Sequence, residues 1–209
     1  MYHFEPIDSQ ESNDMSVQKL HFYKDKSKAF LKRAKYVILY ALNPAKVLTE
    51  KASQKWYLYL FLPAYGWMFF FAQVGFDKSA EYYVPVGQIA LISALGFIAG
   101  YAAVAGTGYL VHLIMKKLKI KVRFDQITSC IAMSHTYMVF SLVLGFIYRI
   151  FGAGSSAAFG VAGFLCTLLP IYSGLRTLGR GNAFFAPLMA TLIGTILLFI
   201  WRLLMFVPL

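Results

Sequence analysis

The chain has 209 residues, of which 59% are hydrophobic and only 14% are charged, and its formal net charge is +11. A soluble domain carries about 25% charged residues, so this composition excludes an ordinary water-soluble globular protein. It favours a protein whose main solvent is lipid, in which the crossing segments must be helices or a closed barrel.

The first 55 residues contain no apolar stretch of the length found in a secretory signal peptide, so none is expected. Acidic residues before position 15 also argue against a mitochondrial transit peptide, which is poor in acids. Residues 1–15 are polar and slightly acidic, which predicts a flexible tail. Residues 16–55 are basic and are interpreted as a cytoplasmic segment that precedes a membrane domain at 56–209.

An amphipathic helix is predicted over residues 27–42, because apolar residues recur there at helical spacing with lysines on the opposite face. This helix either lies along the inner membrane surface or packs under the cytoplasmic face of the bundle, and the sequence leaves both open. Asn43 and Pro44 then form an elbow: the pair ends this helix and can begin the next, with Asn43 as N-cap and Pro44 in the first turn.

Five long apolar stretches follow, each close to the roughly 20 residues that a spanning helix needs. They are continuously apolar rather than alternating, so they predict helices. The fold class is therefore an all-α integral membrane protein, a bundle of five transmembrane helices with an N-terminal amphipathic cytoplasmic or interfacial helix. The expected spans are 56–76, 86–115, 127–151, 157–178 and 183–205. The second is long enough to require tilting, unless it begins late, and Pro63 and Pro170 are expected to kink the first and fourth.

The positive charge is unevenly placed. Seventeen of the 20 Lys and Arg residues lie in the N-terminal segment and in the loops after spans two and four, and three lie in the other loops and ends. Short basic loops stay cytoplasmic, so the N-terminus is predicted inside and the C-terminus outside, which five spans permit. The bacterial cytoplasmic membrane is favoured; a eukaryotic endomembrane and the mitochondrial inner membrane are the alternatives.

Basic residues at the inner face are expected to meet anionic lipid rather than nucleic acid, for which no binding motif is present. The residues assigned to this role are Lys28, Lys32, Arg33, Lys35, Lys116, Lys117, Lys119, Lys121 and Arg123.

Small residues spaced four apart within the spans allow helix backbones to approach closely. They are expected to pack the bundle internally, with dimerisation through one of these faces as the alternative. The residues are Gly96, Gly100, Ala102, Gly106, Ala186, Ala190 and Gly194.

A few polar side chains interrupt the spans, and the predicted topology places them in the inner leaflet or at its edge, where they could converge on one polar cavity. They are His112, Ser134, His135, Thr136, Tyr137, Tyr172, Ser173 and Arg176. An intramembrane ionisable group is a functional candidate, so His135 is the main one, although a histidine bonded between helices is the structural alternative. No Asp or Glu falls within the expected spans, which argues against a proton or cation pump.

Recognisable catalytic, zinc and phosphate-loop motifs are absent, so the sequence predicts no catalytic residue, no metal site and no cofactor. Cys130 and Cys166 fall at different depths in spans three and four, so no disulfide is expected between them.

Three motifs occur in a characteristic order. They are Leu42-Asn43-Pro44, then Gly106-Thr107-Gly108-Tyr109-Leu110-Val111-His112 running into the basic loop, then Ile171-Tyr172-Ser173-Gly174-Leu175-Arg176 followed by Gly179-Arg180-Gly181. With five spans, this order resembles the Yip family of Rab/Ypt-interacting membrane proteins, especially its short bacterial members. The resemblance covers about residues 30–205 and implies a role in vesicle traffic or beside multi-component exporters. The Asp-Leu-Tyr-Gly-Pro signature of eukaryotic members is missing, so Rab binding is not implied.

The expected function is a non-enzymatic scaffold or adaptor for membrane-protein partners, with a homodimer as one arrangement. One alternative is a transport or lipid-handling component that uses the polar residues of span three. Another is an accessory subunit of a large bioenergetic membrane complex.

Overall fold

The computed structural model describes residues 27–32, 34–35, 39, 54–79, 83–148, 155–179 and 184–205. The predicted tail at 1–15, the elbow at Asn43 and Pro44, and the basic residue Arg33 lie outside these residues. The chain divides into two compact units, Met1–Val37 and Ile38–Leu209, which are described separately.

In the first unit, residues 27–32 and 34–35 are helical, in agreement with the predicted amphipathic helix. Lys28, Lys32 and Lys35 are exposed, and so are the apolar side chains of Phe30 and Leu31. Exposed large apolar residues beside exposed lysines are typical of an interfacial helix. The location of this helix at a membrane surface stays a prediction.

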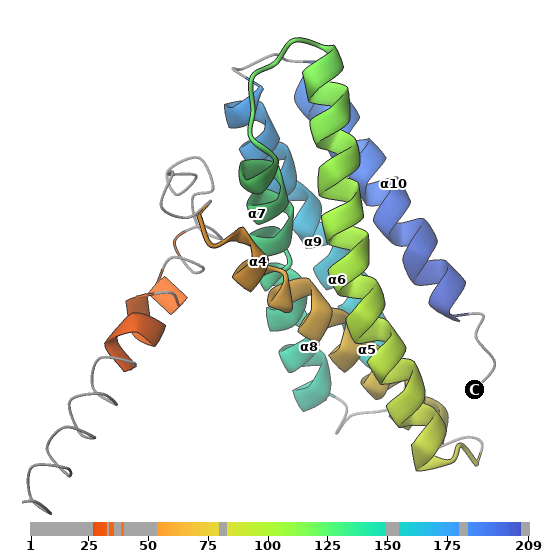
Figure 1. Ribbon diagram of the computed structural model, residues 1–209. Coiled ribbons are helices and arrows are strands. Elements are labelled where there is room, and N and C mark those ends of the chain that lie inside the picture. The colour runs from red at the N-terminus through yellow and green to blue at the C-terminus, as the bar shows by residue number, and fades with distance from the viewer. Residues whose placement is uncertain are drawn as a thin grey trace, which may run out of the picture. The chain divides into compact units, whose positions relative to one another are not determined.

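The second unit is built from helices throughout its described part (Figure 1). In chain order they are α4 (Trp56–Tyr59), α5 (Phe61–Ser79), α6 (Val86–Lys117), α7 (Phe124–Ser134), α8 (Thr136–Tyr148), α9 (Ser155–Leu178) and α10 (Phe185–Met205). Five segments are long and apolar enough to cross a membrane, with α4 joined to α5 and α7 joined to α8. The prediction of an integral membrane protein with five spans is confirmed.

Successive spans run in opposite directions, so α6 and α9 end, and α7 and α10 begin, at the same end of the bundle (Figure 1). We call it the basic end, because it carries the 116–123 segment with its four lysines and one arginine. The 32 residues of α6 make a helix of about 48 Å, longer than the ~30 Å hydrocarbon core. The helix begins at Val86 as expected, so it tilts or projects beyond the lipid.

Several boundaries of the spans differ from the predicted ones. The third span begins at Phe124 rather than at 127, because Gln126 accepts a hydrogen bond from the Arg123 backbone N–H and so caps the first turn. The fourth span begins at Ser155 rather than at 157, so Ser155 and Ser156 belong to α9. Serine is favoured at the start of a helix, which explains why two serines there are compatible with helix.

The first span is interrupted at Leu60, between α4 and α5. Pro63 has no backbone N–H to donate to the carbonyl of Tyr59, so the regular bonding pattern fails at this point. The Ala64 N–H donates to the Leu60 carbonyl at 3.3 Å and the helix then continues to Ser79. The kink predicted at Pro63 therefore takes the form of a short break one turn before the proline.

Glycine allows α6 to lie directly against α5. A Cβ on Gly100 would lie 2.8 Å from the Pro63 carbonyl oxygen, and one on Gly96 would lie 2.7 Å from Cδ2 of Phe71. These distances are shorter than real Cβ contacts, so both positions require the absence of a side chain. The α5–α6 contact is among the most extensive in the bundle.

The contact between α8 and α9 uses glycines that the sequence analysis did not select. A Cβ on Gly163 would lie 2.9 Å from the Met138 Cα, and one on Gly145 would lie 2.8 Å from the Phe159 Cβ. The Ser141 hydroxyl also donates to the Phe159 carbonyl at 2.6 Å, which ties the two helices together.

Helix α10 is held by small residues and by an aromatic cluster. Ala186 and Ala190 are buried, and a Cβ on Gly194 would lie 2.9 Å from Cδ2 of Leu168. Farther along α10 the buried ring of Trp201 lies 4.2 Å from that of Phe70 and stacks on that of Phe164 at 5.6 Å. Gly160 of α9 completes the cluster, since a Cβ there would lie 2.2 Å from Cε2 of Phe70.

One pair of small residues is not used inside the bundle. Ala102 and Gly106 are exposed, and nothing lies within 4 Å of a Cβ built on Gly106. Their predicted internal packing was therefore wrong. The face of α6 that contacts α5 carries Gly96 and Gly100, and the pair at 102 and 106 lies on another face of the same helix.

Two glycines of one helix give a matched stability test. Gly100→Ala should destabilise the bundle by about 1–3 kcal/mol, because the added methyl group meets the Pro63 backbone. Gly106→Ala should be neutral or stabilise by about 0.5–1 kcal/mol, because alanine is the better helix former and the site is open. Unfolding in mixed micelles, followed by helical circular dichroism, measures both; equal effects of the two substitutions would contradict the packing described here.

Candidate functional site

The regular helix of the third span is interrupted at its middle for one residue, whose φ of −67° and ψ of −6° stay in the right-handed helical region. Helix α7 has 11 residues and α8 has 13, and His135 is the single residue between them. The residue is therefore at the centre of the span Phe124–Tyr148, and its location in the inner leaflet stays a prediction. A discontinuous helix at this depth is unusual, because lipid offers no partner for freed backbone groups.

Three consecutive side chains support this break by bonding back to the preceding turn. Ser134 Oγ donates to the Cys130 carbonyl at 2.7 Å, and Thr136 Oγ1 donates to the Met133 carbonyl at 2.6 Å. Between them, His135 Nδ1 lies 2.9 Å from the carbonyl oxygen of Ile131. Side chains that bond to their own helix in this way compete with the regular backbone pattern and bend helices.

The hydrogen bond of His135 determines the protonation of its ring. A carbonyl oxygen can only accept, so Nδ1 carries the proton and the Nε2 of a neutral ring has a free lone pair. His135 is completely buried, and Nε2 has no hydrogen-bond partner. A buried polar atom without a partner costs about 1–3 kcal/mol, so this atom needs an explanation beyond packing.

The helix contacts show what lies at the depth of His135. Gly163 of α9 packs against Met138 of the antiparallel α8, so His135 is level with Thr167, which is buried and bonded to the Phe164 carbonyl. Gly108 of α6 packs against Thr128 of α7, which makes His135 level with Tyr101 of α6.

Other buried polar atoms without a partner lie above and below this level. Toward the basic end they include the hydroxyls of Thr107 on α6 and Ser129 on α7, and also Nδ1 of His112. Toward the other end they include the indole nitrogen of Trp67 and Oε1 of Gln73, both on α5, and also the indole nitrogen of Trp201 on α10. Gln73 also donates through Nε2 to the Leu142 carbonyl at 3.1 Å, and so joins α5 to α8. We call His135, Thr107, Ser129, Trp67 and Gln73 the polar core.

The other residues of the predicted polar cluster do not converge on His135. The half-buried His112 contacts the ring of Phe124, eleven residues from His135 and so about 16 Å away along the span. Tyr172 and Ser173 are half-buried and lie about 10 Å toward the basic end, from the α8–α9 contacts. Arg176 is exposed, and Tyr137 is half-buried.

A carboxyl group does lie within a spanning segment, contrary to the sequence analysis. The first segment extends to Ser79, and Asp77 in its last turn is 8% exposed. The predicted boundary at 76 excluded it by one residue. Asp77 follows Gln73 by four positions, so both lie on one face of α5; that spacing of two polar residues was the signal available in the sequence.

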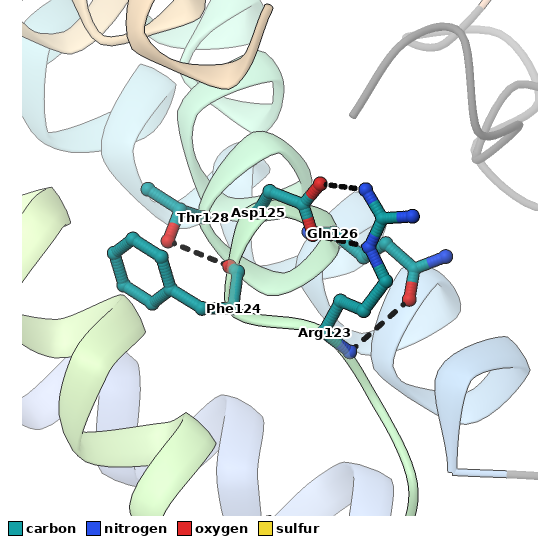
Figure 2. Close-up of polar contacts among 5 residues, drawn as sticks. All are labelled: Arg123, Phe124, Asp125, Gln126 and Thr128. Atoms are coloured by element: carbon teal, nitrogen blue, oxygen red, sulfur yellow. Dashed lines mark hydrogen bonds and ion pairs between the residues drawn. The ribbon is translucent and has the colours of Figure 1, made fainter. Parts of the chain in front are cut away.

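At the basic end, Arg123 and Asp125 form an ion pair in which the guanidinium grips both carboxylate oxygens (Figure 2). The Gln126 backbone N–H donates to the same carboxylate at 3.0 Å, which fixes the first turn of α7. Lys116, Lys117, Lys119 and Lys121 are exposed beside this pair.

No three His, Cys, Asp or Glu side chains gather as a metal site within the described ranges. Cys130 is buried and Cys166 is exposed, and both are free thiols. The groups that the polar core offers are hydrogen-bond donors and acceptors, among them Nε2 of His135.

Comparison with known proteins gives no match: no protein-family model, curated protein or solved structure is significantly similar to this chain.

Proposed function

We propose that this protein is a non-enzymatic membrane transport component whose polar core contacts a small polar solute or a proton as it crosses. The observation that carries the proposal is the break at the centre of the third span, which leaves His135 Nε2 buried and without a partner. Discontinuous spans with binding groups near the bilayer midplane are typical of transporters.

The distribution of the polar core supports this proposal. Four of its residues come from α5, α6 and α7, and the fifth, His135, lies between α7 and α8; they extend from Thr107 and Ser129, through His135, to Gln73. Hydroxyl, imidazole, indole and amide groups suit a neutral polar solute, a proton or water. Asp77 adds a buried carboxyl group near the far end of α5. The chemistry required of each residue is to donate or accept a hydrogen bond.

An adaptor function is the second proposal, favoured by the exposed pair Ala102 and Gly106. Gly96 and Gly100 are covered by α5, but open space surrounds Gly106, so the helix of a second copy of this chain could approach its backbone there.

The proposal has two further parts, which are the orientation of the protein in the membrane and its family. The basic end is proposed to face the cytoplasm, since the short segment 116–123 carries four lysines and one arginine. Membership of the Yip family is proposed from the order of the three sequence motifs and the count of five spans.

Flux through reconstituted vesicles tests the transport proposal. Wild-type protein should speed the entry of glycerol or urea, measured by light scattering, or of protons, measured with entrapped pyranine, above protein-free vesicles. His135→Leu should reduce that flux roughly tenfold or more, because it removes the unpaired acceptor. Thr167→Val is the control at the same depth and should keep the flux. No flux with any probe, or full flux in His135→Leu, would exclude the role given to this residue.

Cysteine labelling tests the orientation. In a variant with Cys130 and Cys166 replaced by serine, Lys121→Cys should react with an impermeant maleimide only after the cytoplasmic side is opened. Lys78→Cys, at the opposite end of α5, should react in intact cells. The reverse pattern would overturn the proposed orientation.

Crosslinking in native membranes tests the adaptor proposal in the same cysteine-free background. Gly106→Cys should give a disulfide-linked product of twice the chain mass, whereas Gly87→Cys, equally open on the same helix, should not. Equal crosslinking at both positions, or none at Gly106→Cys, would remove the support for self-association through this face.

A further inference from the structure

The basic end contains a cavity of about 260 Å³ lined by Lys119, Ile120, Lys121 and Gly179. It lies between the segment that connects α6 to α7 and the C-terminal end of α9. It is therefore at the end of the bundle, well away from the polar core. The liquid volume of one water molecule is about 30 Å³, so the space is large enough for a group of several atoms.

The backbone at Lys119 is in the left-handed region, with φ of 59°, and no other described residue except glycine has a positive φ. It ends α6 in a Schellman motif: the Ile120 N–H donates to the Met115 carbonyl at 2.9 Å, and the Lys119 N–H donates to the Lys116 carbonyl at 3.1 Å. Glycine is the residue this position prefers, because a Cβ is strained there. A lysine at a glycine position indicates that its side chain has a use that offsets the strain.

Gly179 forms the opposite wall of the cavity, and its surroundings leave little room for a side chain. The Gly179 N–H donates to the Leu175 carbonyl at 2.7 Å, and a Cβ on Gly179 would lie 2.7 Å from Cδ1 of Phe185. The end of α9 can therefore pack against the start of α10 only with glycine at this position. The wall consequently presents backbone rather than a side chain, and the two lysines are the charged groups of the lining.

The charge of the cavity is positive. Among the described residues, the acid on this side of the bundle is Asp125, which Arg123 already binds (Figure 2). Within the same ranges no carboxylate forms an ion pair with Lys119 or Lys121. The ends of α6 and α9 each contribute about half a negative charge from the helix dipole, which is less than the two lysines together supply.

We propose that this cavity binds a phosphate group, and specifically the headgroup of an anionic phospholipid. Lysine binds phosphate as a point charge, Ile120 gives an apolar surface toward the acyl chains, and the site lies at the end of the spans where headgroups are found. The inference is independent of the proposed transport function and of the adaptor function, since it uses none of their residues.

Native mass spectrometry and thermal unfolding in detergent test the proposal on the full chain. Dioleoylphosphatidylglycerol should bind and raise the melting temperature, whereas dioleoylphosphatidylcholine should have little effect. The double variant Lys119→Gln and Lys121→Gln should weaken binding roughly 30-fold, from the contribution of two lysines at a membrane surface. The matched control is Lys116→Gln with Lys117→Gln, which removes the same charge from the end of α6 outside the cavity lining. It should weaken binding less than about threefold, because exposed charges that do not contact the phosphate are screened by solvent.

Lys119→Gly gives a separate measurement. This variant is expected to fold, because glycine is the residue that the left-handed backbone position prefers. It should raise the melting temperature without lipid, because the strain is relieved, and lower the affinity for phosphatidylglycerol. Stabilisation by inorganic phosphate or soluble glycerol phosphate equal to that by the lipid would support the phosphate site but assign it to a soluble ligand. Equal losses from the two double variants, or no loss from either, would overturn the proposal.

Discussion

Backbone hydrogen bonding in a medium without water is the constraint on which this structure depends. Each span must bond its own N–H and carbonyl groups, so every interruption needs a local substitute. At His135 the substitutes are the side chains of Ser134, His135 and Thr136, which all bond to carbonyls of the preceding turn. These three residues use their polar groups to support a bent helix, and only the second nitrogen of the imidazole is left over. This nitrogen without a hydrogen-bond partner distinguishes a candidate site from a helix that is only bent.

Close helix approach is the second requirement, and glycine meets it. Lipid tails are as apolar as leucine, so helices associate mainly through van der Waals contact and a few interhelical hydrogen bonds. Gly96, Gly100 and Gly163 each lie where a methyl group would collide with a neighbouring helix. The hydrogen bonds of Ser141 and Gln73 add two fixed points, one to α9 and one from α5 to α8. The position of the polar core follows from this packing, because its residues belong to the helices that the glycines bring together.

The architecture could be predicted from the sequence because the length of an apolar stretch is a local property, and this length decides whether a helix can cross the lipid. The spans and their number follow from it, whereas the spacing of Gly96 and Gly100 predicted a closely packed face without identifying α5 as its partner. The polar cluster could not be predicted well, because depth depends on where each helix begins. The capped turn at Arg123 moved the start of the third span by three residues, and three further residues of α5 brought Asp77 into the first span. Whether a small residue faces a neighbour, as Gly100 does, or lipid, as Gly106 does, depends on helix rotation, which residue spacing alone leaves undetermined.

The aromatic cluster around Trp201 has a consequence for biogenesis. Phe70 comes from the first span, Phe164 from the fourth and Trp201 from near the end of the fifth, so the cluster joins early and late parts of the chain. A nascent chain that has inserted four spans still has two phenylalanine rings without their final neighbour. Completion of the interior must therefore wait for the last helix to leave the translocon, and the earlier helices remain an unfinished assembly until then.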